Sequence, residues 1–183
     1  MASFLKIRHA AQVIRAGGVI AYPTEAVYGL GCNPHDRDAV QKILSLKRRP
    51  ERAGLILIAA DSGQLDGWVA PDTNLDRAMK PGAVVTWVVN AGPETPEWIS
   101  GGRDTVAVRI TRHPIAAALC LETNMPIVST SANRSGRPPA SSALQVRCGF
   151  GPGIDYVLAG PTGKRLQPSE IRDARTGAIL RAG

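Results

Sequence analysis

Polar side chains follow a short apolar run near the start of the sequence. The run at residues 19–22 is typical of a buried strand, and it leads directly into Thr24, Glu25 and Tyr28. In an α/β sheet, ligands usually lie beyond the carboxyl ends of the strands. We therefore expect Thr24 and Tyr28 to present hydroxyl groups to a small ligand.

Two glycines, Gly29 and Gly31, follow Tyr28. Glycines at these positions would let backbone amides approach a ligand closely. The alternative is a strand-to-loop turn in which the glycines supply positive φ angles. The phosphate-binding pattern GxxxxGK[ST] does not occur, so the segment is not a Walker loop.

Two cations, Lys47 and Arg49, lie at the expected end of a helix, shortly before the apolar run at residues 55–60. Arginine offers a planar fork of donors and lysine a mobile point charge, so the pair is suited to a phosphate chain. The alternative is a solvated basic helix end that interacts favourably with the helix dipole.

A second polar strand end lies at residues 129–133. Ser131 and Asn133 can hydrogen-bond a base, a ribose or a phosphate. The alternative is a turn in which the serine, threonine and asparagine side chains bond only to the local backbone.

Arg109 lies within the apolar run at residues 106–110, where an arginine needs an anionic partner or an exit to water. A bound carboxylate and a structural aspartate or glutamate are both candidates for that partner. Near the end of the chain, Ser169, Arg172 and Arg181 either rim a pocket or face solvent.

Helical spacing and capping residues predict the elements that must position these side chains. Apolar residues recur at helical spacing between residues 7 and 14, and glycines 17 and 18 are typical of a helix C-terminus. Asp36 is expected to cap a second helix, and His113 with Pro114 to begin a third at residues 113–122.

Strands are expected at residues 19–22, 55–60, 83–89, 106–110, 127–129, 156–158 and 178–180. Short stretches rich in proline and glycine, at 135–140 and 149–153, are expected to be loops. This alternation predicts an α/β fold in one domain over residues 1–183.

The bulk composition favours a globular protein with an anionic partner. The chain has 183 residues, 44% of them apolar, and a formal net charge of +7. The charge suits a nucleotide or RNA, although a solvated basic surface is the alternative. No apolar run approaches the roughly 20 residues that a membrane span needs. We therefore expect a cytoplasmic protein with no membrane partner.

The cysteines and histidines do not indicate metal or triad chemistry. Cys32, Cys120 and Cys148 are odd in number and far apart, which argues against a disulfide framework or a zinc site. We expect them to be small buried or half-buried residues. His9, His35 and His113 are scattered without metal-ligand spacing, so histidine-driven acid/base catalysis is not expected.

Several segments together resemble one family of enzymes. These are PTEAVYGLG, the KxR of Lys47 and Arg49 followed by proline, VRI before HP, STSAN with SG, and the closing LRAG. In this order, over essentially the whole chain, they resemble the YrdC-like family of L-threonylcarbamoyl-adenylate synthases, in its short bacterial form. The sequence ends at Gly183, so we expect the additional C-terminal domain of longer relatives to be lacking. The resemblance implies a twisted, open, mixed α/β sheet with a positively charged concave face.

The resemblance also implies an activity and its partners. Such an enzyme, a nucleotidyltransferase, condenses L-threonine, bicarbonate and ATP into threonylcarbamoyl-AMP and pyrophosphate. The product feeds the threonylcarbamoyladenosine modification of tRNA through a downstream threonylcarbamoyl transferase complex. Mg²⁺ is expected with ATP, and no redox cofactor. Binding of tRNA or double-stranded RNA on the basic face is a further expectation.

The resemblance assigns roles to particular residues. The implied ATP contacts are Lys47, Arg49, Thr105, Asn133, Ser141 and Arg181, with Lys47 and Arg49 also catalytic. The implied threonine contacts are Thr24, Tyr28, Arg109, Ser131 and Ser169, and no protein-bound metal is expected. Glu25 could orient Mg²⁺, orient a basic neighbour or only cap its loop.

The competing hypothesis is an RNA-binding module without chemistry. A basic α/β surface would explain the charge equally well. Only 4% of the residues are aromatic, however, and no RNP-like or KH-like pattern occurs. The polar strand ends therefore favour a small-molecule pocket.

Overall fold

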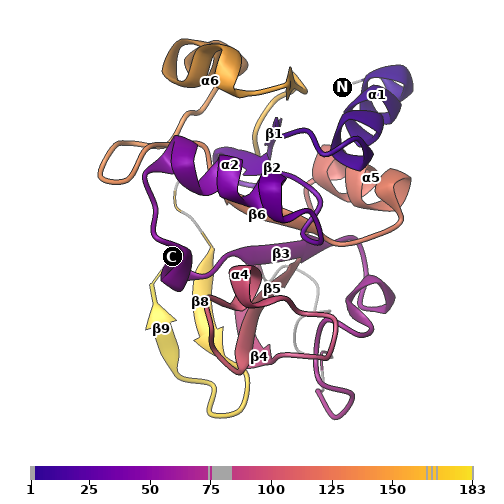
Figure 1. Cartoon of the computed structure of the whole chain (residues 1–183), viewed down its shortest axis with the longest axis vertical. Coiled ribbons are helices and arrows are strands. Elements are labelled where there is room, and N and C mark those ends of the chain that lie inside the picture. The colour runs from indigo at the N-terminus through magenta and orange to yellow at the C-terminus, as the bar shows by residue number, and fades with distance from the viewer. Residues whose placement is uncertain are drawn as a thin grey trace.

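A mixed β-sheet forms the frame of the protein (Figure 1). The structure is a computed structural model and describes residues 3–73, 75, 84–163, 165, 167 and 169–182. Within these residues, nine strands form one sheet in the order β7-β1-β2-β6-β3-β5-β4-β8-β9. The strands are β1 (Ile20–Pro23), β2 (Tyr28–Gly31), β3 (Ile56–Ala59), β4 (Val85–Asn90), β5 (Thr105–Ile110), β6 (Ile127–Ser131), β7 (Tyr156–Val157), β8 (Glu170–Asp173) and β9 (Ile179–Arg181).

The sheet combines parallel and antiparallel pairs of strands. The pairs β1–β7, β3–β5 and β4–β8 are parallel, and the other neighbours are antiparallel. Strands β7 and β9 form its two edges, so the sheet is open. This confirms the expected α/β fold with an open, mixed sheet.

Helices cover both faces of the sheet. The described α-helices are α1 (Phe4–Arg15), α2 (Arg37–Lys47), α4 (Glu97–Ser100), α5 (Pro114–Thr123) and α6 (Ala143–Phe150). Short 3₁₀ turns lie at Glu51–Ala53, Gly63–Leu65 and Gly151–Gly153. In Figure 1, α1 and α5 lie side by side near the N-terminus, and α2 lies across the strands β1, β2 and β6. Within the part of the chain that the structure describes, no helix is long and apolar enough to cross a membrane.

Successive residues of β1 and the residue before it pack into two separate cores, one on each face of the sheet. Ile20 and Tyr22 of β1 pack in one core with the buried residues of α1 and α5. Val19 and Ala21 pack in the other core with the buried residues of α2. Because successive side chains of a strand point to opposite faces, a continuous apolar run is what a sheet covered on both sides requires.

Local capping residues end the helices where the sequence indicates. Gly17 follows α1 with a φ of +80°, the left-handed conformation that favours glycine. The side chain of Asp36 accepts a hydrogen bond from the backbone N–H of Ala39 at 2.9 Å and so caps α2. His113 is the residue before α5, and Pro114 is in its first turn.

Residues 28–31 form a strand, and the alternative of a positive-φ turn at Gly29 and Gly31 is wrong. Gly29 and Gly31 belong to β2 and pair with residues of β1. A Cβ atom on Gly31 would lie 2.5 Å from the carbonyl oxygen of Val128 and 2.8 Å from Cε1 of Tyr22. Glycine is therefore needed at position 31 for close packing, not for backbone freedom.

Three further expectations need correction. Residues 149 and 150 belong to the helix α6 and are not loop. Cys148, on the same helix, is exposed, whereas Cys32 and Cys120 are buried as expected. Strand β8 was not expected, and β4 begins at Val85, while residue 83 of its predicted range lies outside the described residues.

Candidate active site

A cavity of about 400 Å³ collects most of the residues that the sequence points to. It lies at the ends of β2 and β6 and extends over β5, β8 and the 3₁₀ turn Glu51–Ala53. The candidate residues that line it are Thr24, Tyr28, Arg49, Thr105, Arg109, Ser131, Ser169 and Arg181. The candidates that are not among its lining residues are Lys47, Asn133 and Ser141. The fold thus brings together residues from six separate segments of the sequence.

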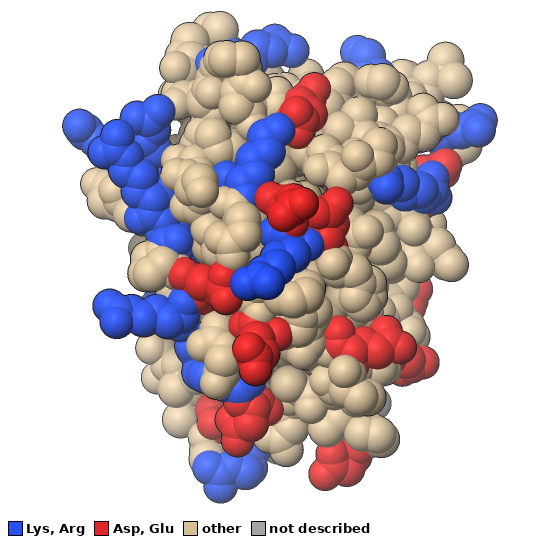
Figure 2. All heavy atoms as spheres, in the orientation of Figure 1, with Lys and Arg blue, Asp and Glu red and all other residues tan. Residues whose placement is uncertain are grey.

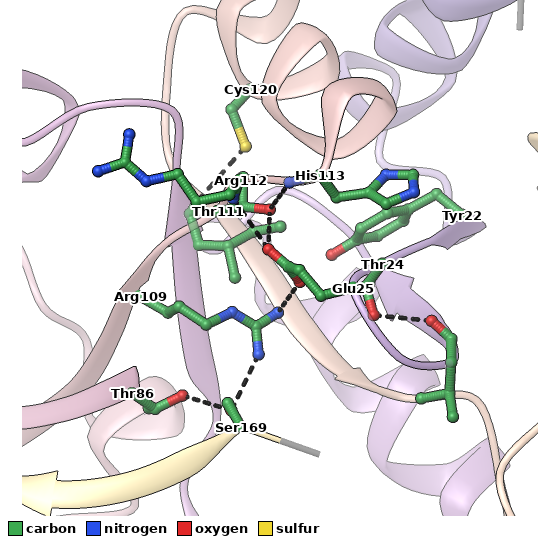
Figure 3. Close-up of polar contacts among 12 residues, drawn as sticks. Tyr22, Thr24, Glu25, Thr86, Arg109, Thr111, Arg112, His113, Cys120 and Ser169 are labelled. Carbon is green, nitrogen blue, oxygen red and sulfur yellow. Dashed lines mark hydrogen bonds and ion pairs between the residues drawn. The ribbon is translucent and has the colours of Figure 1, made fainter. Parts of the chain in front are cut away.

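Arg109 of β5 lies at the inner end of this cavity with both terminal nitrogens engaged (Figure 3). Its Nη1 donates to Ser169 Oγ at 3.1 Å, and its Nη2 lies 3.5 Å from Glu25 Oε2. Its Nε is buried and has no hydrogen-bond partner among the described residues. The structural carboxylate that the sequence left open is therefore Glu25.

Glu25 is the residue whose role sequence reasoning could not assign. Its Oε1 accepts from Thr111 Oγ1 at 2.7 Å and from the backbone N–H of Arg112 at 2.9 Å. Burial opposes ionisation, but the charge of Arg109 and the bond from Thr111 outweigh it, so the pKa of Glu25 lies below its usual value. The position of an acidic residue just after a strand indicated that Glu25 could belong to the site. Its partner, Arg109, is 84 residues away in the sequence and could not be predicted from a local pattern.

Ser169 connects Arg109 to the neighbouring strands. Its hydroxyl lies 2.8 Å from Thr86 Oγ1 of β4, and its backbone oxygen accepts from Arg181 Nη2 of β9 at 2.8 Å. Sequence reasoning predicted Ser169, whereas Thr86, which is fully buried, was missed because it lies inside an apolar run.

The guanidinium groups of Arg49, Arg103 and Arg181 lie near one another in the cavity lining. Burial and the nearby charges of Arg181 and Arg103 lower the pKa of Arg49. Its Nη2 donates to the backbone oxygens of Ala53 and Gly54 at 3.2 and 3.0 Å. Within the described residues, none of these three arginines forms an ion pair with a carboxylate. Cations held together without acidic partners favour an anionic ligand.

Lys47 lies beneath the end of β6. Its ammonium donates to the backbone oxygen of Ser131, and to the backbone and side-chain oxygens of Asn133 at 2.9 and 3.2 Å. An ammonium has three donors, so each has an acceptor. Burial, with a smaller contribution from Arg49, lowers the pKa of Lys47 to about 8. Lys47 thus supports the strand end in this structure.

The polar groups of the Ser131–Asn133 segment bond mainly to one another. Ser131 Oγ donates to Asn133 Oδ1 at 2.6 Å, and Asn133 Nδ2 donates to the backbone oxygens of Arg134 and Arg137. Ser141 is exposed and donates to Gln145 Oε1 at 3.0 Å. This segment matches the self-bonded turn that the sequence left open, although Ser131 still lines the cavity.

The hydroxyls of Thr24 and Tyr28 also have internal partners. Thr24 Oγ1 donates to the backbone oxygen of Val27 at 2.7 Å. Tyr28 Oη donates to the backbone oxygen of Gly160 at 2.6 Å and accepts from its N–H at 3.0 Å. Tyr28 therefore ties β2 to the segment after β7.

The Thr24–Tyr28 and Ser131–Asn133 segments lie side by side and not on opposite walls of the cavity. Gly29 of β2 pairs with Ser131 of β6, so the two strand ends are neighbours in the sheet. The cavity lining also includes Arg49, Arg103 and residues of β8 and β9.

Charge on the face shown in Figure 2 is mixed. Lys and Arg gather along its left edge, whereas Asp and Glu lie over its centre and lower right. A positively charged concave face stays a prediction. Among the described residues, no group of three or more His, Cys, Asp or Glu is placed to hold a metal ion.

Comparison with curated proteins finds close relatives over nearly the whole chain. A protein of Nitrosococcus oceani named threonylcarbamoyl-AMP synthase is 53% identical over 180 residues, which cover 96% of this chain and 97% of that protein. A protein of the same name from Pseudomonas aeruginosa is 48% identical over 185 residues, covering 99% of each chain.

Solved structures of related proteins are also similar over nearly the whole chain. P. abyssi Sua5 complexed with L-threonine matches with a TM-score of 0.89 and 36% identity. The match covers 97% of this chain, which spans 54% of that Sua5 chain. E. coli YciO matches with a TM-score of 0.82 and 28% identity, over 97% of this chain and 88% of that chain. The Sua5/YciO/YrdC family model, described as telomere recombination, matches residues 12–183. The chain therefore belongs to the Sua5/YciO/YrdC family.

Proposed function

We propose that this chain is a nucleotidyltransferase that condenses L-threonine, bicarbonate and ATP into threonylcarbamoyl-AMP and pyrophosphate. The observation that carries the proposal is one cavity that holds both Arg109, which is braced by Ser169 and Glu25, and further arginines that have no carboxylate partner, among them Arg49. The first suits an amino-acid carboxylate and the second suits phosphates. The names of the relatives and the L-threonine in the Sua5 structure support the same activity.

The amino acid is assigned to the Arg109 end of the cavity. We assign its carboxylate to Arg109, with Ser169 beside the guanidinium at 3.1 Å. Thr24 and Ser131 would contact the rest of the amino acid, because both line the cavity near this end. Tyr28 would contribute ring contact, since its hydroxyl already has two bonds to Gly160.

ATP is assigned to Arg49, Thr105 and Arg181, which line the same cavity. Arg181 also donates to the backbone oxygen of Ser169, so it lies between Arg109 and Arg49. Arginines without carboxylate partners can donate paired hydrogen bonds to phosphate oxygens. Lys47 and Asn133 would contribute to ATP binding indirectly, by holding the end of β6 in place. Ser141 does not line the cavity, so a contact with ATP would have to form outside it. The direct contacts implied by the resemblance are thus proposed for Arg49, Thr105 and Arg181.

The chemistry then requires positioning and charge neutralisation more than acid/base catalysis. The threonine amine attacks the carbon of bicarbonate, and a C–O bond breaks as water leaves to give the carbamate. A carbamate oxygen then attacks the α-phosphorus of ATP as pyrophosphate leaves. The arginines around Arg49 would stabilise the charge that develops on the phosphates. Mg²⁺ would enter as part of the MgATP substrate, bound through phosphate oxygens, because Mg²⁺ in such sites is held largely by substrate phosphates and water.

The product would serve the threonylcarbamoyladenosine modification of tRNA in the cytoplasm, through a separate transferase complex. Contact with tRNA or double-stranded RNA on a basic surface remains part of this proposal. A threonylcarbamoyl adenylate is a reactive mixed anhydride, so its consumer must accept it soon after release.

The first test is pyrophosphate release by the purified chain with ATP, Mg²⁺ and bicarbonate, with and without L-threonine. We expect release that depends on threonine, and the mass of threonylcarbamoyl-AMP in the same reaction. Folded protein that releases no pyrophosphate but binds RNA with a steep salt dependence would instead support the RNA-binding module.

A further inference from the structure

Glu25 is held at three points around one carboxylate. Two donors, from Thr111 and the backbone of Arg112, occupy Oε1 at 2.7 and 2.9 Å, and Oε2 faces Arg109 Nη2 at 3.5 Å. Figure 3 shows the carboxylate between the Arg109 guanidinium and the chain at Thr111. The group therefore has a single orientation, with one oxygen anchored to the sheet and the other directed at Arg109.

The backbone at Glu25 is held as firmly as the carboxylate. Its carbonyl oxygen accepts from the N–H of Arg165 at 3.2 Å, and the preceding carbonyl, of Thr24, accepts from Gly163 at 2.9 Å. A Cβ atom on Gly163 would lie 2.3 Å from the Glu25 oxygen, so the two backbones are in close contact. The residue is thus fixed at both ends of its side chain.

The ion pair lies where water screens it little. The side chains of Glu25 and Arg109 each expose only 10% of their surface. Charges in such surroundings interact more strongly than surface charges, and removal of one partner leaves the other buried and unpaired. A change at Glu25 must therefore alter the orientation or the charge balance of Arg109.

We propose that Glu25 is a positioning residue that orients the Arg109 guanidinium toward the carboxylate of the amino-acid substrate. The inference rests on the proposed function, because it assigns that carboxylate to Arg109. Glu25 holds Nη2 and Ser169 holds Nη1, so the guanidinium is braced from two sides before substrate enters. Preorganised donors need no rearrangement when the ligand binds, which favours affinity for a carboxylate at one position.

This role differs from the other two that the sequence left open. A Mg²⁺ ligand needs a carboxylate oxygen free to coordinate, whereas Oε1 of Glu25 already accepts two hydrogen bonds and Oε2 faces a cation. A residue that only capped its own loop would bond within that loop alone, whereas Glu25 also accepts hydrogen bonds from Thr111 and Arg112 at the end of β5. Its depressed pKa keeps the carboxylate ionised at neutral pH.

The test compares the full-length wild-type chain with Glu25→Gln in threonine-dependent pyrophosphate release. Glutamine keeps the shape but loses the charge, and its amide hydrogens would face the donors of Arg109. We expect the KM for threonine to rise about tenfold or more, as expected when a charged partner of a buried pair is lost. The KM for ATP should stay within about twofold, because its proposed contacts are elsewhere.

A substrate analogue separates orientation of Arg109 from general damage. L-threoninol has the amine and hydroxyl of threonine but no carboxylate. Binding of both compounds is measured by titration calorimetry. The wild-type chain should prefer threonine strongly, and Glu25→Gln should reduce that preference, since the lost contact is the one to the carboxylate. An unchanged preference, or equal losses for threonine and ATP, would overturn the proposal.

Two further variants keep the test decisive. Glu170→Gln removes a carboxylate that pairs with Arg172 on β8, next to Ser169 but outside the cavity lining, and it should leave all parameters unchanged. If Glu25→Gln does not fold, Thr111→Val replaces it, because it removes one donor to Oε1 and keeps the charge. We then expect a two- to fivefold rise in the threonine KM, roughly the effect of one lost hydrogen bond, and no rise would overturn the proposal.

Failure of the inference can be told from failure of the proposed function. If the wild-type chain neither binds threonine nor releases pyrophosphate with it, the proposed function fails and this inference fails with it. If the wild-type chain does both and Glu25→Gln behaves identically, only the role of Glu25 is wrong.

Discussion

Lys47 Nζ donates to both oxygens of Asn133, the backbone oxygen at 2.9 Å and the side-chain oxygen at 3.2 Å. With the backbone oxygen of Ser131 as third acceptor, the ammonium holds the end of β6 in one conformation. The strand end that lines the cavity is therefore fixed from below by a residue that does not line the cavity itself.

The first prediction concerns the titration of Lys47. NMR of lysine side chains, assigned with Lys47→Arg, should show Lys47 titrating near pH 8 rather than at its usual 10.5. Between these values the unfolded chain binds more protons than the folded chain, so the contribution of Lys47 to the free energy of unfolding rises with pH. Below pH 8 the buried ammonium opposes folding in full. Titration of Lys47 near 10.5 would contradict this prediction and show that the three acceptors compensate the ammonium for its burial.

The second prediction separates structure from ligand contact at Tyr28. Tyr28→Phe removes the hydroxyl that bonds twice to Gly160 and leaves the N–H and oxygen of Gly160 without it. Denaturant unfolding should show a free energy of unfolding lower by about 1–3 kcal/mol. The KM for threonine should change little, since the ring is retained. A large rise in that KM with unchanged stability would instead place the hydroxyl on the substrate.

The third prediction tests the arginines without carboxylate partners. Arg49→Ala should raise the KM for ATP by about 10- to 100-fold, since a hydrogen bond to a charged group is worth about 1.5–3 kcal/mol. Threonine binding should be affected less. Arg175→Ala, an exposed arginine between β8 and β9, removes the same charge without touching the cavity lining and is the matched control. Equal effects of the two variants would mean that only net charge matters.

The fourth prediction concerns two glycines with opposite surroundings. Gly31→Ala should lower the free energy of unfolding by about 2 kcal/mol or more, because the new Cβ meets the backbone of Val128 at 2.5 Å. Gly149→Ala in α6 has no atom within 4 Å of the new Cβ and should raise that free energy by about 0.5–1 kcal/mol. Urea unfolding of the two variants checks both signs, and a stable Gly31→Ala would contradict the close strand packing.

Elements with strong local signals could be predicted from the sequence. Helix α2 has a capping aspartate, Asp36, and a repeating apolar face, and both act within a few residues of chain. The buried strands β1, β3 and β5 are short apolar runs, and these appear where expected. Local propensity and tertiary structure agree at these elements.

Strands β2 and β8 could not be predicted, because their sequences lack that local signal. Strand β2 reads YGLG, in which glycine is unfavourable for a strand unless another backbone approaches closely, as Val128 does here. Strand β8 reads EIRD and is only half-buried, so its pairing with β4 supplies the stabilisation that its composition does not.

The sequence by itself determined which residue types are available for the site and, through the family motifs, which positions carry them. Tertiary structure alone decided their partners. Glu25 meets Arg109, and Lys47 meets Asn133, across separations of 84 and 86 residues that no local pattern records. The physical reason is that helical and strand periodicities constrain neighbours along the chain, whereas the contacts of a buried charge depend on the order of strands in the sheet. That order placed Arg109 of β5 near Glu25, which follows β1.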